Sequence, residues 1–260
     1  MKRAAVLCIG VLTAAQLFAH DTWIVPSRFV ARRGETIEIQ MTSGMEFPKL
    51  DTAIKPDRVS RAVVRLGGHA SAMDPRSGEH SLNFNARLRA NGVATVAVAL
   101  APKTIELTPA QVTEYLDEIG ADVDLRRQWN NRPEPKRWRE IYTKHAKTFV
   151  RVGRPDDSWQ QPAGLALEFI PLNDPTSLRV AGMFPIRLME NGAPLANFPV
   201  GIVHETDSHG TILKTDGGGR LSIPLARAGR YLIRATHLRP AQRPDADWIS
   251  DFTTLTVDVP

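Results

Sequence analysis

The segment ETIEIQMTS (Glu35–Ser43) alternates apolar residues, Ile37 and Ile39, with polar ones. A period of two is typical of a β-strand with one buried face. Short runs of the same type follow along the chain: AVVRL (62–66), LNFNARL (82–88) and VATVAVALA (93–101). Asn91-Gly92, between the last two runs, predicts a β-hairpin. Short strands separated by turns at this spacing predict an antiparallel β-sandwich.

The pattern changes after residue 107. Thr108 and Gln111 have the spacing of a helical capping box around a proline at the first helical position. They predict a helix over residues 109–119. A second helix is predicted over residues 135–150, because apolar positions there recur at three- and four-residue spacing: Trp138, Ile141, Tyr142, His145 and Phe149. We therefore predict a helical insertion at about 108–150 in the first β-unit.

Strand patterns return with GLALEFIPL (164–172) and continue to the end of the chain. Turn residues separate them at Asn191-Gly192 and at DGGG (216–219). So many short strands after residue 174 suit a second, small sandwich. The predicted fold is mainly β, with two Ig-like antiparallel β-sandwich units at 20–174 and 175–260.

The first nineteen residues have the layout of a secretory signal peptide. Lys2 and Arg3 precede the uncharged run AAVLCIGVLTAAQLFA, which is too short to span a membrane and ends on the small residue Ala19. We predict cleavage between Ala19 and His20, and a periplasmic or secreted mature protein. An uncut membrane anchor is the alternative. No later run approaches the ~18 apolar residues of a spanning helix, so no membrane span is expected in the mature chain.

The composition is that of a globular protein, with 42% hydrophobic and 23% charged residues. It excludes an intrinsically disordered chain and a protein with many membrane spans. Lysine and arginine number 33 against 28 acidic residues, and so small an excess does not indicate nucleic-acid binding. The single cysteine lies in the predicted signal peptide, so neither a disulfide nor a thiolate metal ligand is expected in the mature protein.

The predicted mature start, HDTWIVP (20–26), resembles the "His-Asp/Glu-x-Trp-hydrophobic-x-Pro" opening of a family of exported bacterial proteins. That family is known as a domain of unknown function and as the NikM-like subunit of nickel transport complexes. Similar segments follow at 33–36, 144–148, 235–238 and 247–248, and the family pattern implies that 144–148 ends a helix. The resemblance implies a metal-binding accessory protein linked to nickel or cobalt uptake, with membrane components of an uptake system as partners.

The last 85 or so residues separately resemble carboxypeptidase-regulatory or transthyretin-like sandwiches. The matching segments are 191–195, 215–220 and 229–231. Such modules bind or support other proteins and rarely catalyse. The sequence also lacks a phosphate-binding glycine loop and a nucleophile elbow. We therefore expect no enzymatic activity.

His20 is the strongest candidate metal ligand. After cleavage it would offer an α-amine, with a pKa of ~7.7–8.0, and an imidazole from one residue. Nitrogen donors of this kind suit divalent nickel and copper, and the resemblance adds cobalt. His237 and His145 are the candidates to complete the site, although each position also suits a buried structural histidine. His204 and His209 flank two carboxylates in HETDSHG (204–210), which fits either a polar turn or a ligand cluster.

No role is expected for His69 or His80, which lie in turn-like segments. Three functions remain open from the sequence. The first is the metal-binding accessory protein. The second is a metal-free structural or adhesion module built from Ig-like domains. The third is an oxidoreductase whose copper is held by the N-terminal amine and two imidazoles.

Overall fold

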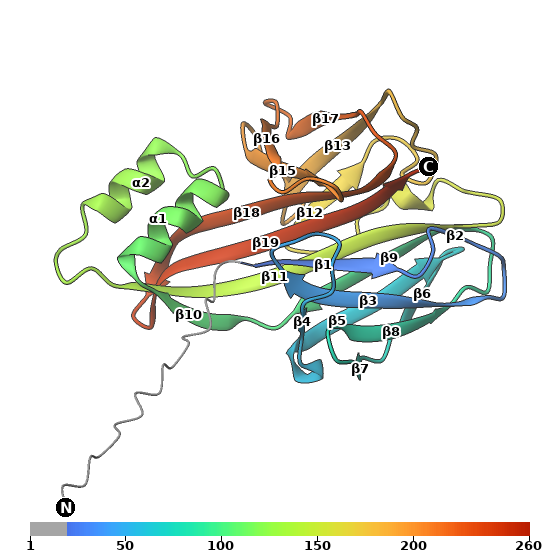
Figure 1. The fold of residues 1–260 in the computed structure, drawn as a ribbon, viewed down its shortest axis with the longest axis horizontal. Helices are drawn as coiled ribbons and strands as arrows, with labels where there is room; N and C mark the ends of the chain where they lie inside the picture. Colours follow the sequence, from blue (N-terminus) through green and yellow to red (C-terminus); the bar gives the residue numbers. More distant parts are fainter. Residues whose placement is uncertain (1–19) are drawn as a thin grey trace, which may run out of the picture.

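The computed structural model describes residues 20–260, so the predicted signal peptide lies outside the described part of the chain. Over these residues the chain folds into three β-sheets stacked in layers, with two helices at one end (Figure 1). The mainly β prediction is confirmed. None of the helices in residues 20–260 is long and apolar enough to cross a membrane.

A sheet formed near the N-terminus, called here the N-terminal sheet, has the strand order β1-β3-β8-β7, with β4 also paired to β3. Its strands are β1 (Asp21–Pro26), β3 (Thr36–Gly44), β4 (Thr52–Ala53), β7 (Arg76–Ser77) and β8 (Leu82–Arg87). The predicted alternation in Glu35–Ser43 is confirmed, because β3 buries Ile37, Ile39 and Met41 on one face.

The largest sheet, called here the central sheet, has the order β16-β15-β18-β19-β11-β9-β5-β6, with β10 and β2 also paired to β11. Its long strands are β5 (Val59–Leu66), β9 (Gly92–Leu100), β11 (Trp138–Val152), β18 (Gly229–Arg243) and β19 (Ala246–Val259). The shorter ones are β2 (Val30–Ala31), β6 (His69–Ala72), β10 (Lys103–Leu107), β15 (Pro199–His204) and β16 (Thr211–Lys214).

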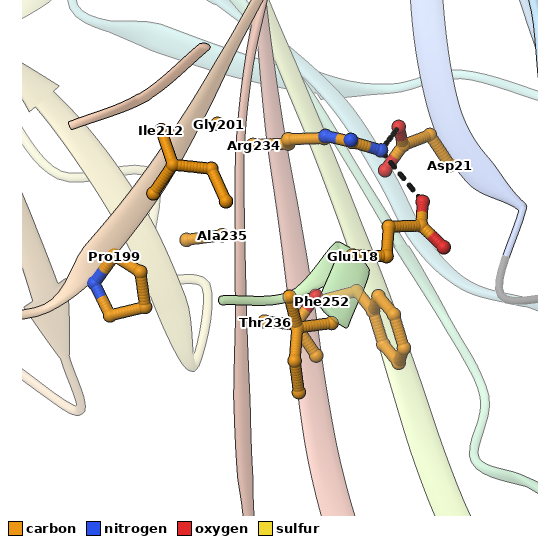
Figure 2. A pocket seen from close by; sticks show the side chains of 10 residues that line it. Asp21, Glu118, Pro199, Gly201, Ile212, Arg234, Ala235, Thr236 and Phe252 are labelled. Atoms are coloured by element: carbon orange, nitrogen blue, oxygen red, sulfur yellow. Dashed lines mark hydrogen bonds and ion pairs between the residues drawn. The ribbon is translucent and has the colours of Figure 1, made fainter. Parts of the chain in front are cut away.

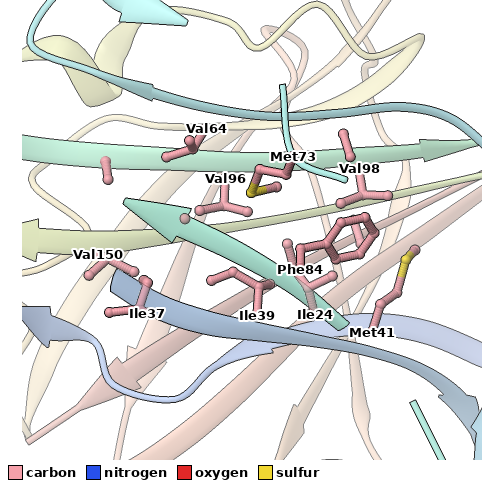
Figure 3. Packing of buried hydrophobic residues seen from close by; sticks show 14 of the residues in the cluster. Ile24, Ile37, Ile39, Met41, Val64, Met73, Phe84, Val96, Val98 and Val150 are labelled. Atoms are coloured by element: carbon pink, nitrogen blue, oxygen red, sulfur yellow. The ribbon is translucent and has the colours of Figure 1, made fainter. Parts of the chain in front are cut away.

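The N-terminal sheet covers part of one face of the central sheet. Ile39 of β3 and Phe84 of β8 pack against Val96 and Val98 of β9 in a continuous apolar core (Figure 3). The long apolar run of β9 is buried almost throughout, because both of its faces are covered.

The opposite face of the central sheet is covered by the C-terminal sheet, made of β12 (Leu167–Pro171), β13 (Gly182–Glu190), β14 (Ala193–Pro194) and β17 (Arg220–Leu225). Phe184 and Ile186 of β13 pack there with Ile233 of β18 and Leu255 of β19. The two sandwiches therefore share the central sheet. The predicted boundary at 174/175 falls between β12 and β13, which are neighbours in one sheet.

The first predicted helix is confirmed as α1 (Pro109–Glu118). Thr108 accepts a hydrogen bond from the Gln111 amide, and the Gln111 side chain accepts one from the Thr108 amide, which completes the capping box. A second helix, α2 (Val123–Asn130), begins at Asp122, whose side chain accepts from the Leu125 amide. The sequence analysis did not predict α2.

The predicted helix over 135–150 is wrong, and so is the helix end expected at 144–148. This stretch is β11, a central strand that pairs in parallel with β19 over Glu140–Thr148 and Trp248–Thr256. The apolar spacing was misleading because β11 is covered on both faces, so its residues do not alternate between apolar and polar. Its buried lysines, Lys144 and Lys147, resemble the polar positions of an amphipathic helix.

The hairpin predicted at Asn91-Gly92 is also wrong. It connects β8 in the N-terminal sheet to β9 in the central sheet, so the turn crosses between layers. Asn191-Gly192 does form a hairpin, between β13 and β14. Its residues have φ angles of 47° and 85°, the positive values that a two-residue type I′ turn requires.

The helices cover the end of the central sheet that the N-terminal sheet leaves free (Figure 1). Tyr115 of α1 and Trp129 of α2 pack there against Trp138 of β11. Trp138 stacks on Trp248 of β19 with ring centroids 4.6 Å apart. This aromatic cluster places α1 beside the start of β1, where the candidate site lies.

Candidate functional site

His20, the first described residue, is held in place by its main chain. It directly precedes β1, which pairs with β3 from Asp21 opposite Gly44 onward. The Lys144 ammonium of β11 donates to the His20 carbonyl at 2.5 Å. Two residues on, the Thr254 hydroxyl of β19 donates to the Thr22 carbonyl at 2.6 Å. The backbone of residues 20–22 is therefore anchored to two strands of the central sheet, and His20 itself to β11.

An ion-pair cluster fixes Asp21, the next residue. Figure 2 shows the Arg234 side chain of β18 extending to the carboxylates of Asp21 and of Glu118 in α1. Arg234 Nη1 lies 2.8 Å from Glu118 Oε1. The arginine crosses directly over Gly201, where an added Cβ would lie 2.9 Å from the Arg234 side chain. The absence of a side chain at Gly201 thus lets one arginine join β1, α1 and β18.

A cavity of about 470 Å³ lies next to His20, between α1, β10, β11 and the segment around β4. Its apolar wall comes from Ile54, Leu100, Ile105, Leu107, Tyr142 and Phe252. Its charged side chains are Lys55, Asp57, Arg58, Lys103, Glu140 and Lys144. The volume lies within the ~300–1,000 Å³ typical of small-molecule sites.

Lys144 is the most deeply buried cation of this cavity, with 9% of its surface exposed. Its ammonium donates to two neutral oxygens, the His20 carbonyl at 2.5 Å and the Thr22 hydroxyl at 3.2 Å. It also lies 5.3 Å from the centre of the Phe252 ring. Burial lowers the pKa of Lys144 from 10.5 to about 8, because desolvation disfavours the charged amine.

Glu140 also lines this cavity, and it is buried but bound by neutral donors. Its carboxylate accepts hydrogen bonds from Trp138 Nε1 at 2.8 Å, from the Tyr115 hydroxyl at 3.1 Å and from the Ser250 hydroxyl. Desolvation raises the pKa of Glu140, and these hydrogen bonds only partly offset it. Desolvation and the Glu140 charge hold the pKa of Tyr115 well above its ordinary value.

The half-buried imidazole of His20 is suited to ligand binding in its neutral form. Desolvation, followed by the positive charge of Lys144, lowers the pKa of His20 below 6.5. The carboxylates of Asp51 and Asp21 oppose this shift. A pKa below its ordinary value leaves the imidazole largely uncharged at neutral pH, the state in which it binds metals.

His145 and His237 are not brought to His20. Lys144 and His145 are adjacent in β11 and point to opposite faces of the central sheet, so His145 lies on the face covered by the C-terminal sheet. There His145 Nε2 is 3.6 Å from Asp251 Oδ1. His237 lies opposite Asp251 in the β18–β19 ladder, and its Nδ1 is 2.5 Å from Glu190 Oε1.

The remaining histidines have simpler environments. His204 is buried, and its ring nitrogens lie 2.9 Å from the Thr206 hydroxyl and from the Ala228 carbonyl, which fits the structural alternative. His69 and His209 are exposed, and His80 contacts the Asp51 carbonyl at 3.2 Å. Across residues 20–260 no group of three or more histidine, cysteine or acidic side chains is arranged to hold a metal ion.

Sequence reasoning identified His20 but missed the cavity next to it. Lys144 was interpreted as part of a helix, and Arg58 and Glu140 received no role. The available signal was the pair of lysines, Lys144 and Lys147, within residues 141–150 of β11, a stretch with no other lysine, arginine or acidic residue. Both are buried in the structure, and buried lysines are rare without a specific partner.

Several solved structures are remotely similar to this chain. Fibronectin(III)-like modules of CbhA from Clostridium thermocellum are 11% identical, with 91% of this chain and 94% of that chain covered and a TM-score of 0.19. The D00-D0 domain of intimin is 12% identical, covers 92% and 99%, and has a TM-score of 0.20. The adhesin FdeC of Escherichia coli is 12% identical, covers 94% and 65%, and has a TM-score of 0.21.

TM-scores of this size are too low to support a statement about the function of this chain. A search of curated proteins found no match. A family model, in contrast, matches residues 17–239, which include β1, both helices, β11 and most of β18. The match therefore spans His20 and every other residue that lines the cavity apart from Phe252. The chain belongs to the family described as Domain of unknown function (DUF4198).

Proposed function

We propose that the mature protein is a periplasmic metal-binding accessory protein, linked to nickel or cobalt uptake, whose N-terminal His20 is the main ligand. The observation that carries this proposal is the fixed position of His20, with its carbonyl bound by Lys144 and a half-buried imidazole of lowered pKa. A preorganised ligand loses little conformational freedom when a metal binds.

The donor set at this end of the chain favours a borderline transition metal. Signal-peptide cleavage after Ala19 would add the α-amine of His20 to its imidazole. Two nitrogens from one residue suit divalent nickel, cobalt or copper, while carboxylate oxygens are weaker ligands for these ions. Asp51, whose charge acts on His20, is the nearby acidic residue that Arg234 does not engage. His145 and His237 belong to the opposite face and are left out of the proposed site.

The other two hypotheses from the sequence have less support. A copper oxidoreductase would need two imidazoles beside the α-amine, and the two histidines expected for this role lie across the central sheet. A metal-free structural or adhesion module fits the sandwich fold but gives no reason for an anchored histidine at the mature start. The proposed partners, membrane components of a metal uptake system, rest on the resemblance of residues 20–26.

Isothermal titration of the tag-free protein beginning at His20 tests the proposal with Ni²⁺, Co²⁺ and Cu²⁺. His20→Ala is expected to weaken binding at least about tenfold, because it removes the imidazole. One glycine inserted ahead of His20 is expected to weaken it as well, because the amine moves away while the imidazole stays. His69→Ala, on exposed β6, is the matched control.

Absence of binding at micromolar metal, or equal affinity of His20→Ala and the wild type, would leave the metal-free module as the better explanation. Intact-mass measurement of the exported protein checks the cleavage site independently. A mature start that differs from His20 would remove the α-amine from the site.

A further inference from the structure

The cavity beside His20 has more positive charge than its carboxylates balance. Lys55, Arg58, Lys103 and Lys144 line it, against Asp57 and Glu140. Glu140 is already bound by three neutral donors. Asp57, Lys55 and Lys103 are exposed at the edge, which leaves Lys144 and Arg58 as the inner cations. The interior of the cavity is therefore electropositive.

The two inner cations lack acidic partners. Within residues 20–260, no carboxylate lies within 4.0 Å of the Lys144 ammonium, which donates only to the His20 carbonyl and the Thr22 hydroxyl. Arg58 donates from Nη2 to the Ala101 carbonyl at 2.8 Å. Its Nε is buried and has no hydrogen-bond partner among the described residues.

Both cations lie over one aromatic ring. The Arg58 guanidinium carbon is 5.7 Å and the Lys144 ammonium 5.6 Å from the centre of the Tyr142 ring. Cation–π contacts stabilise such charges in part. A buried charge without an ionic partner remains costly, so an anion entering the cavity would gain two preorganised cations.

The rest of the wall favours an apolar body on that anion. Ile54, Leu100, Ile105 and Leu107 are the aliphatic side chains of its lining, and Phe252 lies near Lys144. Exposed apolar surface of this kind inside a cavity gains from contact with a hydrocarbon or aromatic group. An inorganic anion would leave this surface in contact with water.

We propose that this cavity binds a compact organic carboxylate, with its carboxylate between Lys144 and Arg58 and its apolar part against the aliphatic wall. The site borders the metal site proposed above, because His20 lines the same cavity, but it does not depend on a bound metal. The carboxylate of the ligand would be the anionic partner that Lys144 and Arg58 lack among the described side chains. The hydrocarbon part would replace water along Ile105 and Leu107.

Titration calorimetry with three probes tests this proposal on the mature protein: 3-phenylpropionate, its neutral counterpart 3-phenylpropan-1-ol, and acetate. We expect 3-phenylpropionate to bind with a dissociation constant below about 1 mM. The alcohol is expected to bind at least about tenfold more weakly, because it lacks the charge. Acetate is expected to bind at least about tenfold more weakly, because it lacks the apolar body.

Variants locate the binding. Lys144→Met keeps the length of the side chain and removes its charge, and we expect it to weaken 3-phenylpropionate at least about tenfold. Lys214→Met, on exposed β16, is the matched control. Ile105→Trp fills the cavity from its partly exposed wall, and it tests the same point if Lys144→Met fails to fold.

The proposal is overturned if no probe binds at millimolar concentration, if the alcohol binds as tightly as the acid, or if Ile105→Trp does not weaken binding. Ni²⁺ titration of the same samples keeps the two proposals apart, because Ile105 has no part in the metal site. Wild type that binds the acid but no metal would contradict only the metal proposal. Wild type that binds metal but no probe would contradict only this one.

Discussion

Lys147 of β11 and Glu168 of β12 form the most deeply buried ion pair among the described residues. It links the central sheet to the C-terminal sheet. Lys147 is 1% and Glu168 2% exposed, and their charged atoms are 2.6 Å apart. Glu168 also accepts from the amides of Ala163, Gly164 and Leu165. The carboxylate therefore organises the turn before β12 while the lysine joins β11 to it. Because both side chains are shielded from solvent, water cannot replace either partner of the ion pair.

Removing only the lysine should be costly. We expect Lys147→Met to lower the free energy of unfolding by about 3 kcal/mol, because the Glu168 carboxylate would stay buried without its cation. Urea unfolding followed by tryptophan fluorescence measures the change, with Lys214→Met as the exposed control. A loss no greater than that of the control would show that the amides alone satisfy Glu168.

At the scale of elements, local signals predicted some segments and failed for others. β3 and α1 were predicted because alternation and a capping box are encoded within a few residues. β11 was not, since a strand covered on both faces has no alternation that would distinguish it from a helix. Asn91-Gly92 has the residues typical of a hairpin turn. However, β8 and β9 pair with other strands in different sheets, and local sequence does not encode this choice of partners.

The candidate site was also predicted only in part from local sequence. His20 was identified from its chemistry at a predicted cleavage site, which depends on neighbouring residues alone. The cavity combines segments that start at His20 and end at Phe252, including β10 and α1. No local pattern connects them. The structure does not bring His145 and His237 to His20, because strand parity places both on the opposite face of the central sheet.

The helical layer is attached to the central sheet through Asp247 at the start of β19. Its carboxylate binds Arg132, beyond α2, at 2.7 Å and the Arg139 amide of β11 at 3.0 Å. Desolvation raises the pKa of Asp247, but the hydrogen bonds from Arg139 and the charge of Arg132 outweigh it, so the pKa is lowered overall. A carboxyl with a lowered folded-state pKa stabilises the fold at pH values above its unfolded pKa.

We therefore expect Asp247→Asn to destabilise the protein by about 2 kcal/mol at pH 7, because hydrogen bonds to a charged group are lost. The difference should persist down to the unfolded pKa of about 3.9 and shrink as pH falls through the lower folded value. Urea unfolding of both proteins at pH 7 and at pH 3 measures it. A difference that stays constant or grows on acidification would contradict this assignment.

For the molecule as a whole, the shared central sheet makes the two sandwiches interdependent. β19 pairs with β18 on one side and with β11 on the other. β12, which precedes residue 175, is a neighbour of β13 in the C-terminal sheet. The second sandwich therefore takes two of its strand pairings from the first part of the chain.

We expect the isolated segment 175–260 not to fold on its own. Without β11 and β12 it would expose the edges of β19 and β13 and part of their shared core. Far-UV circular dichroism and the chemical-shift dispersion of the amide protons measure whether the segment folds. The reference is the protein of residues 20–260, which we expect to unfold in a single cooperative transition. Cooperative unfolding of the isolated segment would show that the sandwiches are separate domains.

The position of β19 has a consequence for the order of events during biosynthesis. β19 joins β18 to β11 in the middle of the central sheet, and it follows every other described strand in the sequence. Until residues 246–259 have been synthesised, the nascent chain lacks the strand that joins β18 to β11, and the central sheet stays open between them. Since pairings between distant segments form late and slowly, we expect the central sheet to be completed late in synthesis, after the strands on both sides of β19 have been made.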